Sequence, residues 1–274
     1  MARALVIARA GVRSIHNAWI DRGTQRDFDL YVSPHEPVPF QSEPGEGVEI
    51  GPVMGEIKWR ALHRLLHEWQ GWRAYEFVAF ADDDVLMDQK SWSSFFDLVR
   101  QRNAALAQPA LTHDSFWSHI ITLRNANFVW RETTFIEAMV PCFRADVLER
   151  LLPTFGLSKS GWGYGLEFVW AKRLDYKDII VVDATPMRHT RPVGANYPPG
   201  LMESLRKEMH ELMQAENAPW LLATLAGQTR DQLLPREAAR FLRLYIEGYW
   251  DLAKDNDRFL GSLLQAQTGA RLTF

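Results

Sequence analysis

The segment Phe77-Val78-Ala79-Phe80-Ala81-Asp82-Asp83-Asp84 decides the fold prediction. Its first five residues are apolar on both faces, as expected of a central strand in a sheet that is covered on both sides. Three consecutive carboxylates follow at the carboxyl end of that strand, which is where open α/β sheets bind their ligands. These carboxylates repel one another, so they need a compensating cation. The segment therefore predicts an α/β sheet with a ligand site at this strand end.

Strand and helix patterns alternate on both sides of this segment through about residue 199. Short apolar runs predict strands, and apolar residues three or four positions apart predict helices. The expected strands are 3–8, 28–33, 104–111, 134–143 and 179–183, and the expected helices are 56–72, 89–102, 144–152 and 165–174. Such alternation is typical of an α/β domain, so we expect a mostly parallel, Rossmann-like sheet flanked by helices.

The pattern changes after Pro199, where only helical periodicity is seen, over 201–213, 231–249 and 251–267. The chain is therefore divided into an α/β domain over 1–199 and an all-helical C-terminal extension over 200–274. The apolar stripe of 201–213 indicates packing on its own domain or, alternatively, binding to a membrane surface or a partner helix.

Composition narrows the classes of protein. The 274 residues carry 31 Lys and Arg against 34 Asp and Glu, a net charge of −3, so no basic excess points to nucleic acid. The single cysteine, Cys142, excludes an intramolecular disulfide. No signal peptide or transmembrane helix is indicated. We expect a cytoplasmic protein, and peripheral binding to the inner face of a membrane stays open.

The three aspartates admit two interpretations. Hard carboxylate oxygens at a strand end favour Mg²⁺ or Mn²⁺ shared with phosphate oxygens. The alternative is a solvated acidic turn in which one aspartate caps the following helix. Three carboxylates behind a buried strand favour the metal–diphosphate site.

Two further segments carry candidate chemistry. In Gly161-Trp162-Gly163-Tyr164-Gly165 the glycines permit close backbone approach, and Glu167 follows in the first helical turn. Glu167 is a candidate general base or, alternatively, an acid that stabilises the helix start. After the last strand, His189 could join the carboxylates on a metal, and Arg188 and Arg191 could bind phosphate. The alternative for these residues is an ordinary surface loop.

The order of these motifs resembles the DUF707 family, which is similar to GT-A glycosyltransferases. The resemblance covers roughly 70–195, and its motifs are Asp82–Asp84, Gln108–Leu111, Glu137–Pro141, Gly161–Gly163, Val182–Asp183 and Arg188–His189. It implies a GT-A-like fold and a metal-dependent glycosyltransferase. Such an enzyme would transfer a sugar from a nucleotide-sugar donor to a hydroxyl of a glycan or glycolipid acceptor.

The resemblance also implies roles for individual residues. Asp84, His189 and Asp82 would bind Mn²⁺ or Mg²⁺, and Asp82 would also contact the ribose or donor sugar. Glu167 would be the base that deprotonates the acceptor hydroxyl. The remaining nucleotide-sugar contacts would come from Ala8, Arg9, Ser33, Lys58 and Asp83.

Tryptophan is abundant, with eleven residues. Four lie at apolar helical positions and are expected in the core: Trp59, Trp69, Trp92 and Trp170. Three fall in or near the predicted cleft, where a ring face could stack against a sugar: Trp117, Trp130 and Trp162.

Two other classes of function compete with the transferase. One is a non-catalytic carbohydrate- or nucleotide-binding protein on the same scaffold. The other is a Mg²⁺-dependent phosphohydrolase or nucleotidyltransferase that uses the same carboxylates. A base opposite the leaving group would favour inversion over retention, and the amino-acid sequence does not decide between them.

Overall fold

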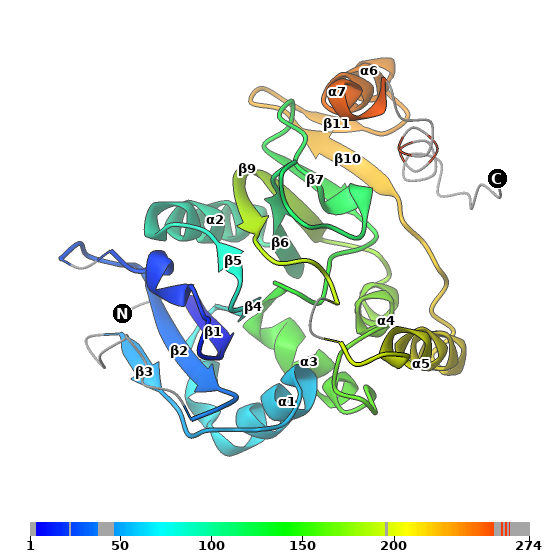
Figure 1. Cartoon of the computed structure of the whole chain (residues 1–274). Helices are drawn as coiled ribbons and strands as arrows, with labels where there is room; N and C mark the ends of the chain where they lie inside the picture. Colours follow the sequence, from blue (N-terminus) through cyan, green and yellow to red (C-terminus); the bar gives the residue numbers. More distant parts are fainter. Residues whose placement is uncertain are drawn as a thin grey trace.

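The computed structural model describes residues 4–21, 23–37, 47–194 and 197–254, together with positions 259, 261 and 263. One large twisted sheet runs through the molecule, with helices packed against its two faces (Figure 1). Within the described residues, no helix combines the length and apolar character needed to cross a membrane.

The strands in chain order are β1 (Ala4–Ala10), β2 (Phe28–Pro34), β3 (Val48–Ile50), β4 (Phe77–Asp82), β5 (Val85–Leu86), β6 (Leu106–Leu111), β7 (Trp130–Thr133), β8 (Cys142–Arg144), β9 (Ile179–His189), β10 (Thr224–Gln228) and β11 (Leu233–Pro235). The α-helices are α1 (Lys58–Glu68), α2 (Gln89–Arg102), α3 (Ala145–Phe155), α4 (Leu166–Arg173), α5 (Leu201–Ala215), α6 (Ala239–Glu247) and α7 (Trp250–Ala253). Short 3₁₀ turns are η1 (His16–Trp19), η2 (Gln70–Ala74) and η3 (Ile120–Thr122).

The sheet is mixed, which corrects the prediction of a mostly parallel sheet. Its order is β11-β10-β7-β9-β6-β8-β4-β1-β2-β3, and the run β4-β1-β2-β3 is parallel. Strand β8 is antiparallel to both β4 and β6, and β7 is antiparallel to β9 and β10. A parallel neighbour needs a long crossover connection. Between β6 and α3 the chain forms no α-helix to supply one, so β7 and β8 enter antiparallel.

Two predicted strands differ from the structure by more than two residues at one end. The expected strand over 134–143 is wrong, because β7 ends at Thr133, β8 begins at Cys142, and 134–141 is irregular. Strand β9 continues to His189, six residues beyond its expected end at Asp183. Both differences place polar residues at the sheet edge, where the candidate site lies.

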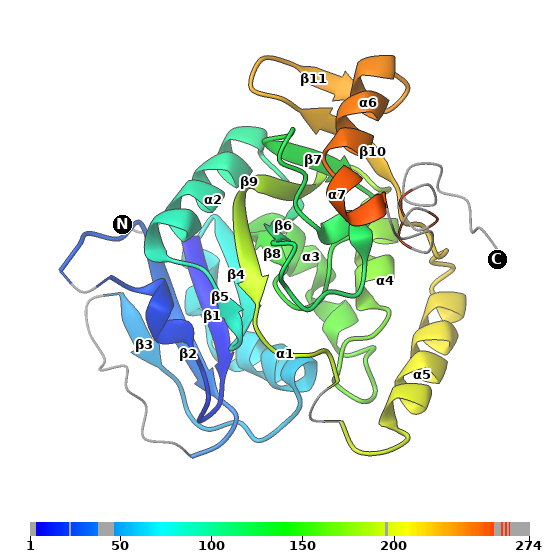
Figure 2. The same cartoon turned by 45° about the horizontal axis from the view of Figure 1, so that its top comes forward.

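The chain after 200 is not all-helical, which corrects the second fold prediction. Helix α5 forms as expected, but β10 then pairs with β7, and β11 extends the same sheet (Figure 2). Thr224 and Ala226 of β10 are buried, since this strand covers an otherwise open sheet edge. The helix expected over 251–267 lies mostly outside the described residues. The division of the chain at 199/200 stays a prediction.

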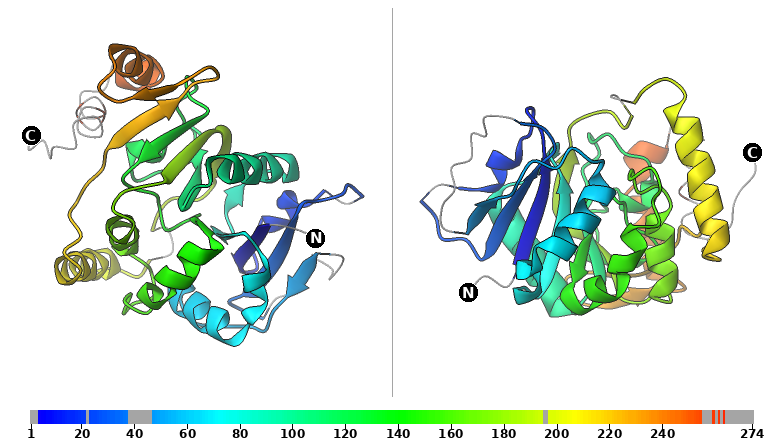
Figure 3. Two further views of the ribbon diagram at one scale, coloured as in Figure 1. Left: turned by 180° about the vertical axis from the view of Figure 1, so that it is seen from behind. Right: turned by 90° about the horizontal axis from the view of Figure 1, so that it is seen from below.

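The core has two layers, one on each face of the sheet (Figure 3). On one face α2 buries Trp92, Phe95 and Phe96. On the other face α1 and α4 bring Trp59 and Trp170 together, with ring centroids 5.0 Å apart. Aromatic rings of this size bury the most apolar area per residue. Five tryptophans are fully buried, so the tryptophan excess mainly builds the core: Trp19, Trp59, Trp72, Trp92 and Trp170.

A buried ion pair joins β7 and β9. Arg131 and Asp183 are both fully buried, with Nε and Oδ2 2.8 Å apart. Arg131 also donates to the carbonyls of Ile121 and Leu123, and Asp183 accepts from the backbone N–H of Asn125. Every strong hydrogen-bonding group of the pair is thus satisfied inside the protein. Asp183, which belongs to a motif of the resemblance, therefore has a structural role.

Replacing Arg131 tests this pair. Arg131→Met leaves Asp183 buried without its cation, and we expect the free energy of unfolding to fall by about 3–5 kcal/mol. The double variant Arg131→Met/Asp183→Asn keeps an acceptor for Asn125 and should recover a large part of that loss. Chemical denaturation measures both. A loss below about 1 kcal/mol in the single variant would contradict a structural role for the pair.

Candidate active site

A cavity of about 500 Å³ opens at the carboxyl ends of β1 and β4. This is the edge at which the sequence predicted a ligand site. Its walls come from segments far apart in the chain. Polar and aromatic residues of the wall include Arg9, Lys58, Asp82, Asp83, Asp84, Glu137, Trp162, Glu167, His189, Arg191 and Tyr197.

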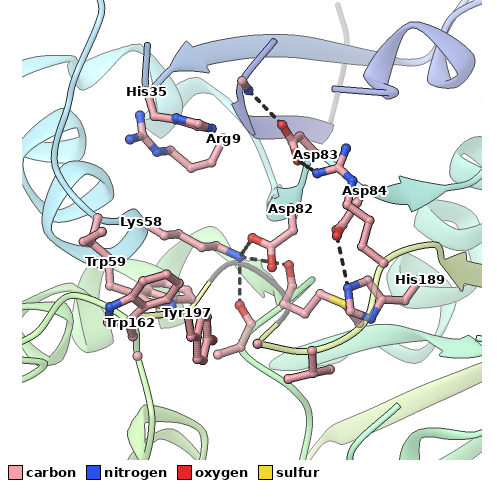
Figure 4. Close-up of a pocket in the computed structure, with 18 of the residues that line it drawn as sticks. Arg9, His35, Lys58, Trp59, Asp82, Asp83, Asp84, Trp162, His189 and Tyr197 are labelled. Atoms are coloured by element: carbon pink, nitrogen blue, oxygen red, sulfur yellow. Dashed lines mark hydrogen bonds and ion pairs between the residues drawn. The ribbon is translucent and has the colours of Figure 1, made fainter. Parts of the chain in front are cut away.

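The first aspartate, Asp82, is paired with Lys58 (Figure 4). Lys58 is the first residue of α1, and its Nζ lies 2.7 Å from Asp82 Oδ1. The same ammonium donates to the carbonyls of Ala138 and Met139, both at 2.9 Å. Burial raises the pKa of Asp82 and lowers that of Lys58, while the ion pair opposes both shifts. All three donors of Lys58 are engaged, so it ties the strand end to the 138–139 segment.

The second aspartate, Asp83, lies in the turn after β4. Arg191 Nη1 is 3.0 Å from its Oδ1, and the backbone N–H of Gly11 donates to its Oδ2 at 2.8 Å. Arg191 also donates to the carbonyl of Arg13. Asp83 therefore links the loop after β1 to the segment after β9.

The third aspartate, Asp84, faces His189. The antiparallel β5–β9 pair brings them together, and His189 Nε2 lies 3.3 Å from Asp84 Oδ2. The other ring nitrogen, Nδ1, lies 2.7 Å from the carbonyl of Phe116, which only accepts, so Nδ1 carries a hydrogen. Burial lowers the pKa of His189, but the hydrogen bond and charge of Asp84 outweigh it and leave the pKa raised.

Each of the three carboxylates is thus offset by a cation or a histidine of this chain, drawn from Lys58, Arg191 and His189. Side chains of this chain therefore supply part of the positive charge that the three aspartates were predicted to need. Among the described residues, no three histidine, cysteine or acidic side chains gather as a complete metal cluster. A cation at this site would need ligands from the substrate.

Asp84 and His189 nevertheless have the chemistry of a partial metal site. Asp84 Oδ1 is buried without a hydrogen-bond partner. When neutral, His189 turns the Nε2 lone pair toward the same carboxylate, since Nδ1 holds the hydrogen. Two such donors side by side fit a divalent cation that takes its remaining ligands from phosphate oxygens and water.

Glu167 lies in the first turn of α4 and lines the cavity. Its side chain is buried, and Oε2 has no hydrogen-bond partner. Burial, with a smaller contribution from the charge of Glu137, raises the pKa of Glu167 to about 8. A buried carboxyl with an unpaired oxygen is suited to exchange a proton with a bound hydroxyl group.

The glycine loop before α4 allows this placement. Gly163 has φ +85°, and a Cβ there would lie 2.2 Å from the Trp59 ring. Glycine is therefore needed for both the left-handed backbone and the close approach to α1. The loop seats the start of α4, and with it Glu167, against the core.

The residues predicted to flank the nucleotide are only partly in the cavity wall. Arg9 lines it, and its guanidinium donates to Ser33 Oγ at 3.0 Å and to the carbonyls of Met54 and Glu56, both at 2.7 Å. Burial lowers the pKa of Arg9 to about 10. Ser33 is buried beneath Arg9 and Ala8 lies in the core; neither is among the described residues that line the cavity.

The three tryptophans expected near a sugar are separated in the structure. Trp162 lines the cavity and packs against Tyr197, with ring centroids 4.5 Å apart. Trp130 is buried in the core layer beside Arg102, and Trp117 packs against Phe259. Of the three, only Trp162 is found among the described lining residues.

Two lining residues, Glu137 and Tyr197, were not predicted as site residues. Glu137 lies in the irregular 134–141 segment that periodicity assigned to a strand, and Tyr197 follows the last strand of the domain. The resemblance did include Glu137 among its motifs, without a role. That motif was the one signal that could have found it.

No protein-family model matches the chain, and no curated protein matches it. Among solved structures, the chain is similar to S. aureus TarS 1–349, with a TM-score of 0.50 and 10% identity over 98% of this chain and 81% of that chain. TarS 1–349 in complex with UDP-GlcNAc gives a TM-score of 0.48 and 10% identity over 97% and 81%. The fold is therefore GT-A-like, as TarS is.

Gly163→Ala tests the close approach of the glycine loop. We expect a loss of unfolding free energy about 1–3 kcal/mol larger than that of Gly200→Ala, because only position 163 adds a clash to the strained backbone. Gly200 is the matched control, with φ +79° and nothing within 4 Å of an added Cβ. Equal losses in thermal or chemical unfolding would contradict the clash.

Proposed function

We propose that this chain is a metal-dependent glycosyltransferase that moves a sugar from a nucleotide-sugar donor to a hydroxyl of a glycan or glycolipid acceptor. One observation carries the proposal: a single cavity holds both the Asp84–His189 pair and the buried Glu167, whose Oε2 has no hydrogen-bond partner. Similarity of fold to TarS, a GT-A glycosyltransferase, supports it. The motif order that resembles the DUF707 family points the same way.

Asp84 and His189 would hold a Mn²⁺ or Mg²⁺ ion, which would neutralise charge on the nucleoside-diphosphate leaving group. The orphaned Asp84 Oδ1 is the observation in favour, because it lacks any other partner. Asp82 and Asp83 are held by Lys58 and Arg191, so they are positioned to accept hydrogen bonds from ribose or sugar hydroxyls. Trp162 presents a ring to the cavity against which a sugar face can stack.

Glu167 would accept the proton of the acceptor hydroxyl as that oxygen attacks the sugar. Its burial excludes water, and its raised pKa makes the ionised form a strong base. Such a carboxyl lowers the stability of the fold at neutral pH, since it is ionised in the unfolded chain and burial disfavours its charged form in the folded one. A protein that only binds carbohydrate gains nothing from it, which favours catalysis over the binding-module alternative.

Asp84→Asn tests the metal role. We expect Mn²⁺ to enhance thermal stabilisation by UDP or GDP in the parent protein, and this enhancement to be lost in the variant. Asp97→Asn is the control, because Asp97 is an exposed residue of α2 paired with Arg100. Differential scanning fluorimetry with and without Mn²⁺ makes the measurement. Unchanged Mn²⁺ dependence in Asp84→Asn would remove Asp84 from the proposed site.

Glu167→Gln tests the base. We expect nucleotide-sugar binding within about threefold of the parent and a loss of transfer of roughly 10²–10⁴-fold. In the parent, the rate should rise with pH through about 8, because Glu167 must lose its proton to act, and this rise should vanish in the variant. The assay is release of nucleoside diphosphate from UDP- and GDP-sugars, with water or added glycans as acceptor.

A measurement of the free energy of unfolding of Glu167→Gln tests whether this variant is correctly folded. Below pH 4.5 Glu167 is protonated in both the folded and the unfolded chain, so its raised pKa has no effect on stability. Between pH 4.5 and about 8 the unfolded chain is ionised while the folded chain keeps the proton, so the loss of stability grows with pH. Glu167→Gln should therefore be more stable than the parent by on the order of 3 kcal/mol at pH 7, and by little at pH 4. Full transfer activity in this variant would exclude Glu167 as the base.

A further inference from the structure

Glu137 is a cavity residue to which the proposed mechanism gives no role. It lies in the irregular 134–141 segment, and its half-buried side chain lines the cavity. The hydroxyl of Thr122 lies 2.7 Å from Glu137 Oε1, and the backbone N–H of Glu137 donates to Gln108 Oε1 at 2.5 Å. Thr122 and Gln108 are both fully buried.

This arrangement aims one carboxyl into the cavity. Buried polar side chains such as Gln108 and Thr122 lower stability unless they are hydrogen-bonded. Gln108 Oε1 accepts from the backbone N–H of Glu137, and the Thr122 hydroxyl lies within hydrogen-bond distance of Glu137 Oε1 and of the carbonyl of His119. A carboxylate accepts about four hydrogen bonds, so acceptor capacity remains for a ligand. Rigid support of this kind is typical of a residue that must hold a precise position.

The residues next to Glu137 are hydrogen-bonded to Lys58 and Asp82, at the end of β4. Lys58 donates to the carbonyls of Ala138 and Met139, the two residues that follow Glu137, and the same ammonium holds Asp82. The backbone N–H of Asp82 also donates to the carbonyl of Met139 at 3.1 Å. The segment carrying Glu137 is therefore fastened to the strand end that bears the three aspartates.

Glu137 lines the same cavity as the proposed metal-holding pair, Asp84 and His189, and the proposed base, Glu167. If the diphosphate is held at Asp84 and His189, and the acceptor oxygen at Glu167, the transferred sugar occupies the cavity that Glu137 lines. A carboxylate in that space meets sugar hydroxyls.

We propose that Glu137 accepts a hydrogen bond from a hydroxyl of the transferred sugar and so determines which donor sugar is used. This inference rests on the proposed function. A site built to bind a hydroxyl discriminates strongly against an analogue that lacks it, since the buried acceptor is then left unpaired. Glu137 is thus a specificity residue, separate from the metal-holding pair and from the base.

The experiment compares binding of nucleoside diphosphate with binding of the intact nucleotide sugar. UDP, GDP, their sugar conjugates and the corresponding deoxy-sugar conjugates are titrated calorimetrically against the parent, Glu137→Gln and Glu203→Gln. Glu203 is an exposed residue in the first turn of α5 and serves as the control. Thr122→Val removes the hydroxyl beside Oε1 while leaving the carboxyl in place.

We expect Glu137→Gln to bind nucleoside diphosphate within about twofold of the parent and to bind the nucleotide sugar at least tenfold more weakly. The ratio of the affinity for a nucleotide sugar to the affinity for the analogue that lacks the recognised hydroxyl should fall toward one. Thr122→Val should show a smaller loss in the same direction, so the inference stays testable if Glu137→Gln does not fold. Glu203→Gln should match the parent.

Three outcomes overturn the inference. An equal loss of nucleoside diphosphate and nucleotide-sugar affinity would place Glu137 outside the sugar position. Unchanged donor binding with a raised KM for the acceptor alone would assign it to the acceptor. Parent-like discrimination in Glu137→Gln would remove its role in specificity. If the parent protein binds no nucleoside diphosphate, the proposed function fails first and this inference fails with it.

Discussion

The candidate site depends on the repulsion among three adjacent carboxylates and on how the chain relieves it. Each aspartate faces a partner from a different segment: Lys58 from the start of α1, Arg191 from the segment after β9, and His189 from the end of β9. Because these partners are drawn together by the charges, one strand end fastens α1, β9 and the loop after β1 around a single cavity. Asp84 has a buried oxygen, Oδ1, without a hydrogen-bond partner, which is why the cation is proposed there.

The mixed sheet serves this arrangement. A helix-connected parallel strand at β8 would exclude the irregular segment 134–141 from the sheet edge. The antiparallel entry of β7 and β8 instead leaves that segment at the cavity, where it supplies Glu137 and the two carbonyls bound by Lys58. The buried Arg131–Asp183 pair then locks β7 to β9 behind it. The charged pair Arg131–Asp183 is thus buried behind this edge of the sheet, while Glu137 lines the cavity in front of it.

Several elements were predictable from local patterns, for specific physical reasons. The buried strand before Asp82 has no polar residue on either face, and the glycine loop before Glu167 needs conformations that only glycine adopts readily. Strand β10 was missed because a strand of only five residues carries little periodicity of its own. The prediction of a strand over 134–143 was wrong because apolar residues such as Phe135 and Ile136 are buried in the core from an irregular segment.

The amino-acid sequence by itself determined the α/β class, the edge of the sheet at which the cavity lies and the identity of the acidic residues there, because these follow from strand hydrophobicity and from charge at neighbouring positions. Only the tertiary structure decided which partner each aspartate has, that Trp130 and Asp183 are structural, and that Glu137 points into the cavity. Those facts depend on contacts between residues tens of positions apart. Such contacts arise from packing and hydrogen bonding across the sheet, which no local pattern encodes.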